Sequence, residues 1–137
     1  MSFNILNHLS KPEMIKNYKK LNSSFNKKLI FNFGYEAGFY SEFNNMILAI
    51  IYCLENQIEF KIYSKDAKFT SNEGWNDFFL PFCDESINIF HKYFNRRRHL
   101  DIENTKNSIF KRIIISVFKF ICPKTYLTND IWQEFHS

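Results

Sequence analysis

The sequence predicts an α/β fold in which an open parallel sheet is flanked by helices. A short apolar run at residues 28–33 ends at Gly34 and has the pattern of a strand. An apolar helix is expected over residues 41–54, and a second strand over residues 58–63. A strand, a helix and a strand in succession normally close as a parallel crossover, so the two strands should lie side by side.

A helix is expected ahead of the first strand. Ser10 can cap it, and Pro12 suits its first turn. Its narrow apolar stripe comprises Met14, Ile15, Tyr18 and Leu21. Residues 22–27 then form a polar linker into the strand. We expect this helix to pack across an edge of the sheet.

The helix between the two strands should begin at Ser41, a natural N-cap residue. Its buried face is predicted to comprise Phe43, Met46, Ile47, Ile50, Ile51 and Leu54. In the second strand, Phe60 and Ile62 should face one way. The opposite face should carry Glu59, Lys61 and Tyr63.

Three further helices are expected towards the end of the chain. Residues 84–86 can cap the first, which carries Ile87, Phe90, His91 and Phe94. The second, residues 104–121, is strongly amphipathic and stops at Pro123. It either lies on a sheet or partner domain, or forms an interfacial helix with a basic rim. The third opens near Leu127, with Thr128 or Asn129 as its cap.

Composition indicates one globular domain over residues 1–137. Apolar residues make up 45% of the chain, while Pro and Gly together contribute only six residues, so the chain is not of a disordered class. The formal charge is +4 and the pI is near 8.9. That charge is too small, and the basic patch at residues 96–99 too short, to predict a nucleic-acid partner.

Compartment is indicated by the cysteines and the N-terminus. Cys53, Cys83 and Cys122 are odd in number, widely spaced and set among apolar neighbours, so we interpret them as buried free thiols. The first ten residues lack the basic start and apolar core of a signal peptide. No apolar stretch approaches the ~20 residues that span a bilayer. A cytoplasmic location follows, with peripheral membrane contact through residues 104–121 kept open.

The glycines after the first strand are the candidate binding feature. Gly34 and Gly38 are separated by three residues, so they match neither the dinucleotide fingerprint nor a P-loop. A glycine turn at the carboxyl end of a strand, with a helix N-terminus behind it, can present main-chain amides to an anion. Alternatively the glycines only relieve backbone strain. Glu42 and Asn44 follow and could point into the same crevice.

No catalytic constellation is predicted. The acidic residues Glu73, Asp77, Asp84 and Glu85 have no spacing that makes an acid and base pair. The four histidines are scattered and stand near no nucleophile. No metal site is expected, since no Cys and His ligand spacing occurs.

Two motifs nevertheless carry a family resemblance. Residues 38–46 read Gly-Phe-Tyr-Ser-Glu-Phe-Asn-Asn-Met, and residues 74–82 read Gly-Trp-Asn-Asp-Phe-Phe-Leu-Pro-Phe. A Gly-aromatic-x-x-polar loop after the first strand and a Gly-Trp-x-x-x-Phe-x-Pro turn after the second resemble the α1,6-fucosyltransferases, with their nodulation and O-fucosyltransferase relatives. The likeness covers residues 28–85.

The resemblance implies the N-terminal domain of a GT-B-like glycosyltransferase, which moves fucose from GDP-fucose with inversion and without a bound metal or other cofactor. In such enzymes the arginine motif that grips the donor pyrophosphate lies in a second, Rossmann-like domain. This chain would therefore be a half that is inactive alone and needs a complementary C-terminal domain, a nucleotide sugar and a glycan acceptor. The rival interpretation is a non-catalytic module of the same fold that docks on a partner chain or a membrane surface.

By position, the resemblance carries over a supporting set rather than catalytic residues. The loop facing the inter-domain cleft would comprise Gly38, Phe39, Tyr40, Ser41, Glu42 and Asn44. Phe69, Gly74 and Trp75 would form an aromatic wall beside that loop.

Overall fold

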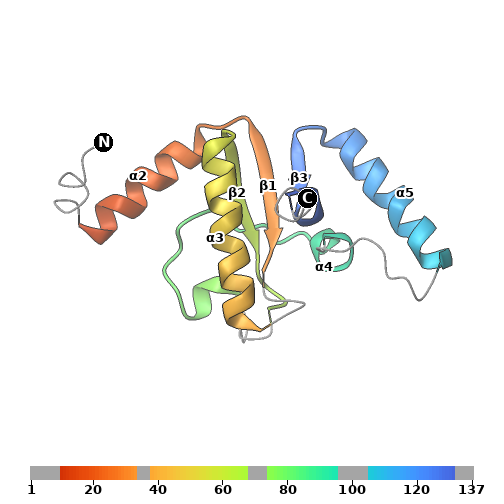
Figure 1. The fold of residues 1–137 in the computed structure, drawn as a ribbon, viewed down its shortest axis with the longest axis horizontal. Coiled ribbons are helices and arrows are strands. Elements are labelled where there is room, and N and C mark those ends of the chain that lie inside the picture. Colours follow the sequence, from red (N-terminus) through yellow and green to blue (C-terminus); the bar gives the residue numbers. More distant parts are fainter. Residues whose placement is uncertain (1–9, 34–37, 68–73, 96–104, 132–137) are drawn as a thin grey trace.

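The computed structural model describes residues 10–33, 38–67, 74–95 and 105–131, and they form an α/β fold. In chain order the helices and strands are α2 (Lys11–Ser23), β1 (Lys27–Asn32), α3 (Phe39–Glu55), β2 (Ile58–Tyr63), the 3₁₀ turn η1 (Trp75–Asp77), α4 (Phe90–Phe94), α5 (Thr105–Ile121) and β3 (Thr125–Leu127). Figure 1 shows their arrangement around a small sheet.

The sheet has three strands in the order β2-β1-β3, and β1 pairs in parallel with both neighbours (Figure 1). Leu29 is in register with Phe60 on β2 and with Tyr126 on β3. The predicted parallel pairing of the first two strands is confirmed. A parallel bridge between Ile62 and Glu85 adds one more position outside β2. The strand that follows β1 in the sequence thus pairs on one side of it, and β3 later pairs on the other side.

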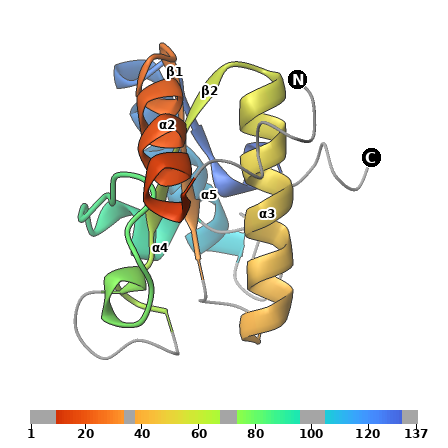
Figure 2. The same ribbon diagram turned by 90° about the vertical axis from the view of Figure 1, so that its left-hand side faces the viewer.

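Both faces of the sheet are covered. Helix α3 lies on one face, and α4 lies on the other (Figure 2). Helix α2 lies at the β2 end of the sheet, and α5 lies at the opposite end, beyond β3 (Figure 1). The burial of β2 on both of its faces follows from this layering, since only Lys61 in that strand is partly exposed.

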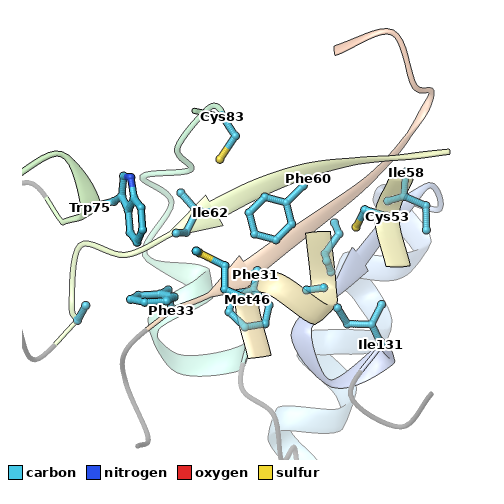
Figure 3. Packing of buried hydrophobic residues seen from close by; sticks show 13 residues of the cluster. Phe31, Phe33, Met46, Cys53, Ile58, Phe60, Ile62, Trp75, Cys83 and Ile131 are labelled. Atoms are coloured by element: carbon cyan, nitrogen blue, oxygen red, sulfur yellow. The ribbon is translucent and has the colours of Figure 1, made fainter. Parts of the chain in front are cut away.

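The hydrophobic core joins the strands to α3 and to the Gly-Trp turn (Figure 3). Its buried members include Phe31, Phe33, Phe60 and Ile62 from the strands and their ends, Met46, Ala49 and Cys53 from α3, and Trp75, Cys83 and Ile131 from elsewhere. The predicted buried face of α3 was wrong in part, because Ile47, Ile51 and Leu54 are exposed. This helix is apolar around most of its circumference, so its sequence pattern did not determine which side packs on the sheet.

Helix α2 begins as predicted. The Ser10 hydroxyl accepts from the Glu13 N–H at 3.3 Å, and the Glu13 carboxylate accepts from the Ser10 N–H at 3.2 Å, which completes a capping box. The helix packs on β2, which is the expected edge position. Its apolar stripe is only half buried, since Met14 and Leu21 are exposed while Ile15 and Tyr18 are partly covered.

Two predicted boundaries were wrong. Helix α3 is capped by Gly38 rather than Ser41, so it starts three residues earlier than expected. Residues 84–86 do not cap a helix, because Asp84 and Ser86 exchange main-chain hydrogen bonds with Ile62 and α4 begins only at Phe90. Strand β3 was not anticipated. Helix α5 matches its predicted range, and none of the described helices combines the length and apolar character needed to cross a membrane.

Candidate functional site

The two motifs meet in space at the carboxyl end of β1. Phe39, at the start of α3, stacks on Phe79 of the Gly-Trp turn with ring centroids 5.7 Å apart and planes at 10°. Phe33, directly after β1, meets Trp75 edge to face at 5.5 Å. Strand, loop, helix start and turn therefore share one aromatic cluster, although up to forty-six positions separate its members. We call Phe33, Phe39, Trp75 and Phe79 the motif cluster.

Gly38 lies at the rim of this cluster and is exposed. Its φ of −66° is accessible to any residue, and a Cβ built on it would meet no atom within 4 Å. Backbone strain therefore does not explain this glycine. It caps α3 without any side-chain hydrogen bond, and the first main-chain N–H groups of a helix have no intrahelical acceptor. Such a helix start can receive an anion. Gly34, the other glycine of the loop, lies outside the described residues.

The remaining loop residues divide between solvent and core. Tyr40, Ser41 and Asn44 are exposed, with Tyr40 at 82%. Glu42 is buried within the first turn of α3. Positions two apart on a helix lie about 200° apart, so Glu42 and Asn44 do not share a crevice as the sequence suggested. The accessible part of the loop is thus Gly38 with Tyr40, Ser41 and Asn44.

The Gly-Trp turn is anchored to the end of β2. Gly74 has a φ of +93°, and a Cβ there would lie 2.4 Å from the Ser64 Oγ and 2.8 Å from the Ser64 carbonyl carbon. The Trp75 N–H donates to the Ser64 Oγ at 2.7 Å, and the indole N–H donates to the Leu80 carbonyl at 3.0 Å. Trp75 is therefore a buried anchor of the core. Phe69 lies outside the described residues.

Acidic residues near the turn hold its structure. The Ser64 hydroxyl donates to the Glu85 carboxylate at 2.9 Å, so Ser64 links the turn to the segment beside β2. The Asp77 carboxylate accepts from the Gly74 N–H at 3.3 Å. Glu73 lies outside the described residues. These contacts give a structural role to Glu85 and Asp77, two of the four acidic residues in the predicted cluster.

A polar network that the sequence did not reveal fills the gap between the carboxyl ends of β1 and β3. The Asn95 carboxamide donates to the Ile30 carbonyl at 2.6 Å and accepts from the Thr128 N–H at 2.7 Å. Its nitrogen also lies 3.0 Å from the Nδ1 of His91. Both amide hydrogens and the amide oxygen are thus used. Asn32 joins the network, since its N–H donates to the Thr128 hydroxyl at 2.9 Å and its amide donates to the His91 carbonyl at 2.9 Å.

His91 is neutral within this network. Because the Asn95 nitrogen can only donate, His91 Nδ1 is the acceptor and the ring proton resides on Nε2. Burial lowers the pKa of His91 from 6.5 to about 4. In an open α/β sheet this gap between strands is the place where ligands commonly bind. Here buried, mutually satisfied side chains occupy it, whereas Gly38 is exposed.

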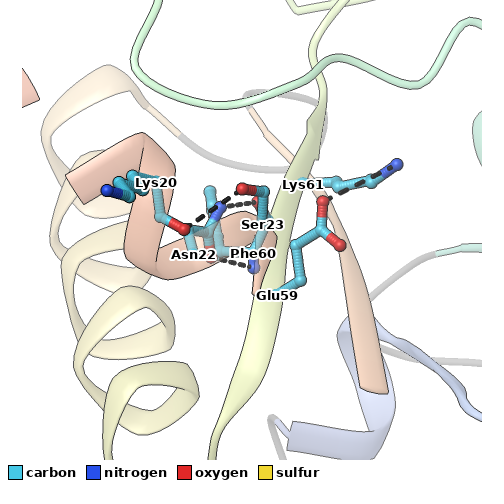
Figure 4. A network of polar contacts seen from close by, with 6 residues as sticks. All are labelled: Lys20, Asn22, Ser23, Glu59, Phe60 and Lys61. Atoms are coloured by element: carbon cyan, nitrogen blue, oxygen red, sulfur yellow. Dashed lines mark hydrogen bonds and ion pairs between the residues drawn. The ribbon is translucent and has the colours of Figure 1, made fainter. Parts of the chain in front are cut away.

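A hollow lies against the amino-terminal half of β2. Its volume is about 330 Å³, and its described lining is Lys19, Lys20, Asn22, Ser23, Glu59, Cys83 and Asp84. Figure 4 shows Lys20, Asn22, Ser23 and Glu59 around the strand, with Glu59 3.9 Å from Lys61. Two lysines and two carboxylates line this hollow, so neither sign of charge dominates it. Among the described residues no group of three or more His, Cys, Asp or Glu side chains could hold a metal ion.

No family model matches the chain, and no curated protein or solved structure matches it either.

Proposed function

We propose that this chain is the N-terminal half of a GDP-fucose-dependent, fucosyltransferase-like glycosyltransferase of glycan or surface-polysaccharide synthesis, inactive without a complementary C-terminal domain. The observation that supports it most is the motif cluster. The glycine loop and the Gly-Trp turn together carry the resemblance to this family, and Phe39 of the loop stacks on Phe79 of the turn. Two motifs of one site are expected to meet in this way.

The position of the cluster also suits a binding role. It lies at the carboxyl end of β1, and ligands of open α/β sheets bind outside the carboxyl ends of their strands. Gly38 adds a helix start that neither strain nor packing requires to be glycine. A small residue there permits close approach of a phosphate or a sugar to the main chain.

The proposed reaction needs a partner domain. An acceptor hydroxyl would attack the anomeric carbon of fucose, lose its proton and displace GDP with inversion. The chain would contribute a loop with exposed Tyr40, Ser41 and Asn44, which by resemblance faces the cleft between the two domains. The pyrophosphate-gripping arginine motif belongs to the second domain by resemblance. We therefore assign no catalytic residue in this chain and expect activity only in an assembly that supplies that domain.

The test begins with the protein as its own cells make it. The chain is captured under native conditions, and the mass of the polypeptide and of any partner is measured. GDP release from GDP-fucose is then assayed beside GDP-mannose, with a glycan extract of the same cells as the acceptor. We expect turnover with GDP-fucose and a loss of at least about tenfold in Gly38→Val, because a branched side chain blocks close approach. A Cβ at Gly38 meets no neighbour, so the variant should keep its fold. Asn17→Ala, an exposed change on α2, is the matched control.

Two results would overturn the proposal. If a folded Gly38→Val protein keeps full turnover, the loop does not contact the reacting molecules. If no captured assembly releases GDP from GDP-fucose, the fucosyltransferase assignment is wrong.

The second candidate is a non-catalytic module of the same fold. It is favoured by Ile47, Leu48, Ile51 and Leu54, which leave one side of α3 apolar and between 37 and 48% exposed. If a partner chain binds that side of α3, Ile51→Asp should abolish its binding. Gly38→Val should leave that binding unchanged. The two variants therefore separate a docking module from an enzyme half.

A further inference from the structure

Helix α5 has two apolar faces, and only one of them packs on the protein. On the inner face Ile115 is buried, and the Phe118 ring stacks on Phe90 with centroids 4.3 Å apart and planes at 14°. On the outer face six large apolar side chains are between 51 and 87% exposed, namely Ile109, Phe110, Ile113, Val117, Phe120 and Ile121. We call these six the outer face of α5.

The outer face is continuous. With 3.6 residues per turn, its six positions fall within an arc of about 120°, while position 115 falls directly opposite the middle of that arc and position 118 lies about 60° beyond its edge. A helix that only covers a protein core needs one apolar stripe. The second stripe has no partner among the described residues, and a contiguous exposed patch of this kind marks an interaction site.

Charge indicates what the outer face binds. The 17 residues of α5 include four basic residues and no acidic one. On the inner side Lys119 is paired with Asp130. Arg112 is exposed at the border of the outer face and makes no ion pair within the described part of the chain. It lines a hollow of about 490 Å³ together with Ile109, Ile113, Ser116, Val117 and Phe120. A guanidinium beside an apolar hollow suits a molecule with an anionic head and a hydrocarbon chain.

We propose that α5 binds the surface of an anionic membrane, with its outer face inserted at the boundary between headgroups and acyl chains. Because the inner face stays on Phe90, the helix would lie flat on the bilayer as an interfacial helix. Arg112 would contact lipid phosphate at the border. A second copy of the chain is a poorer occupant, since pairing two outer faces would bring the Arg112 guanidinium of each copy to the interface with no acidic residue of α5 to pair it. This proposal is independent of the fucosyltransferase assignment.

Vesicle co-sedimentation of the purified full chain tests the proposal. Vesicles of phosphatidylcholine alone are compared with vesicles that also contain phosphatidylglycerol, at low and high salt. We expect binding that rises with the anionic lipid and falls with salt. Arg112→Glu should weaken binding about tenfold, because a basic residue at the surface becomes an acidic one. The double variant Val117→Asp with Phe120→Asp should reduce binding to background.

Ile51→Asp is the matched control, because Ile51 on α3 is 47% exposed and Val117 on α5 is 51% exposed. It should bind vesicles like the unmodified chain. Circular dichroism and thermal unfolding establish that each variant is folded. The proposal is overturned if the unmodified chain ignores anionic vesicles, or if Ile51→Asp loses binding as fully as the double variant. It is also overturned if sedimentation shows a dimer that the α5 variants disrupt, because the outer face would then be a protein interface.

Discussion

Asn22 and Phe60 are joined by two hydrogen bonds that close an edge of the sheet. The Asn22 amide nitrogen donates to the Phe60 carbonyl at 2.9 Å, and its oxygen accepts from the Phe60 N–H at 2.7 Å (Figure 4). Two residues along β2, the main chain of Ile62 bonds instead to Asp84 and Ser86. The outer edge of β2 is thus closed by a side chain at one point and by a main-chain segment at the next. Such closure prevents pairing with another chain.

Asn22→Ala should destabilise the protein by about 2–4 kcal/mol, because both main-chain groups of Phe60 would lose buried hydrogen bonds. Urea unfolding measures the free energy. Asn17→Ala on the same helix is the control, since Asn17 is exposed, and it should change stability by less than about 0.5 kcal/mol. Equal effects of the two substitutions would show that the Asn22 contacts contribute no specific stability.

Gly74→Ala should also destabilise the fold, by about 2–4 kcal/mol, since the residue has a φ of +93° and its added Cβ would lie 2.4 Å from the Ser64 Oγ. Gly38→Ala is the paired control. Its φ is ordinary and its Cβ would meet nothing, so only the weaker capping ability of alanine remains, at about 1 kcal/mol or less. Thermal unfolding of both variants measures this difference in stability. A stable Gly74→Ala protein would contradict the turn geometry.

The predictable parts of the fold rest on local signals. The capping box at Ser10 and Glu13 marks the start of α2 within four residues of sequence. The strands β1 and β2 are short apolar runs joined by one helix, so their parallel pairing follows from chain connectivity. Helix α5 carries a strong amphipathic pattern that ends at Cys122 and Pro123.

The parts that escaped prediction depend on distant partners. Strand β3 has three residues and is extended because it pairs with Lys28–Ile30, nearly a hundred positions earlier. The buried side of α3 could not be chosen because the helix is apolar on several sides. In the polar network, no sequence pattern marks Asn32 or Thr128 as partners. Only the fold brings the Asn32 N–H to the Thr128 hydroxyl, at 2.9 Å. Their one visible signal is that each lies at the carboxyl end of a strand.

The three cysteines should differ in reactivity. Burial raises the pKa of Cys53 to about 12 and also raises the pKa of Cys83, whereas Cys122 is only half buried. An aromatic disulfide reagent at mildly alkaline pH should therefore label one thiol quickly and the other two only on unfolding. Cys122→Ser should remove the fast phase. A fast phase that survives this substitution would mean that Cys53 or Cys83 is accessible.

Stability should fall as acid protonates His91. Its pKa is near 4 in the folded state and near 6.5 in the unfolded chain, so the unfolded state binds more protons between these values. The free energy of unfolding is therefore complete above pH 6.5 and declines as the pH falls towards 4, by about 3 kcal/mol in total. Protonation would also place a ring N–H against the amide nitrogen of Asn95, which can only donate. Nuclear magnetic resonance titration of the ring protons and urea unfolding across this range measure both quantities.

His91→Asn is the variant that isolates this effect, because its side chain keeps an oxygen acceptor but does not titrate. It should be less stable at neutral pH, through loss of ring packing on Phe118 and Tyr63, yet its stability should change little between pH 6.5 and 5. Carboxylates titrate mainly below that window, so the unmodified protein should show the larger slope there. Equal slopes in the two proteins, or a His91 that titrates near 6.5 while the protein is folded, would contradict its burial beside Asn95.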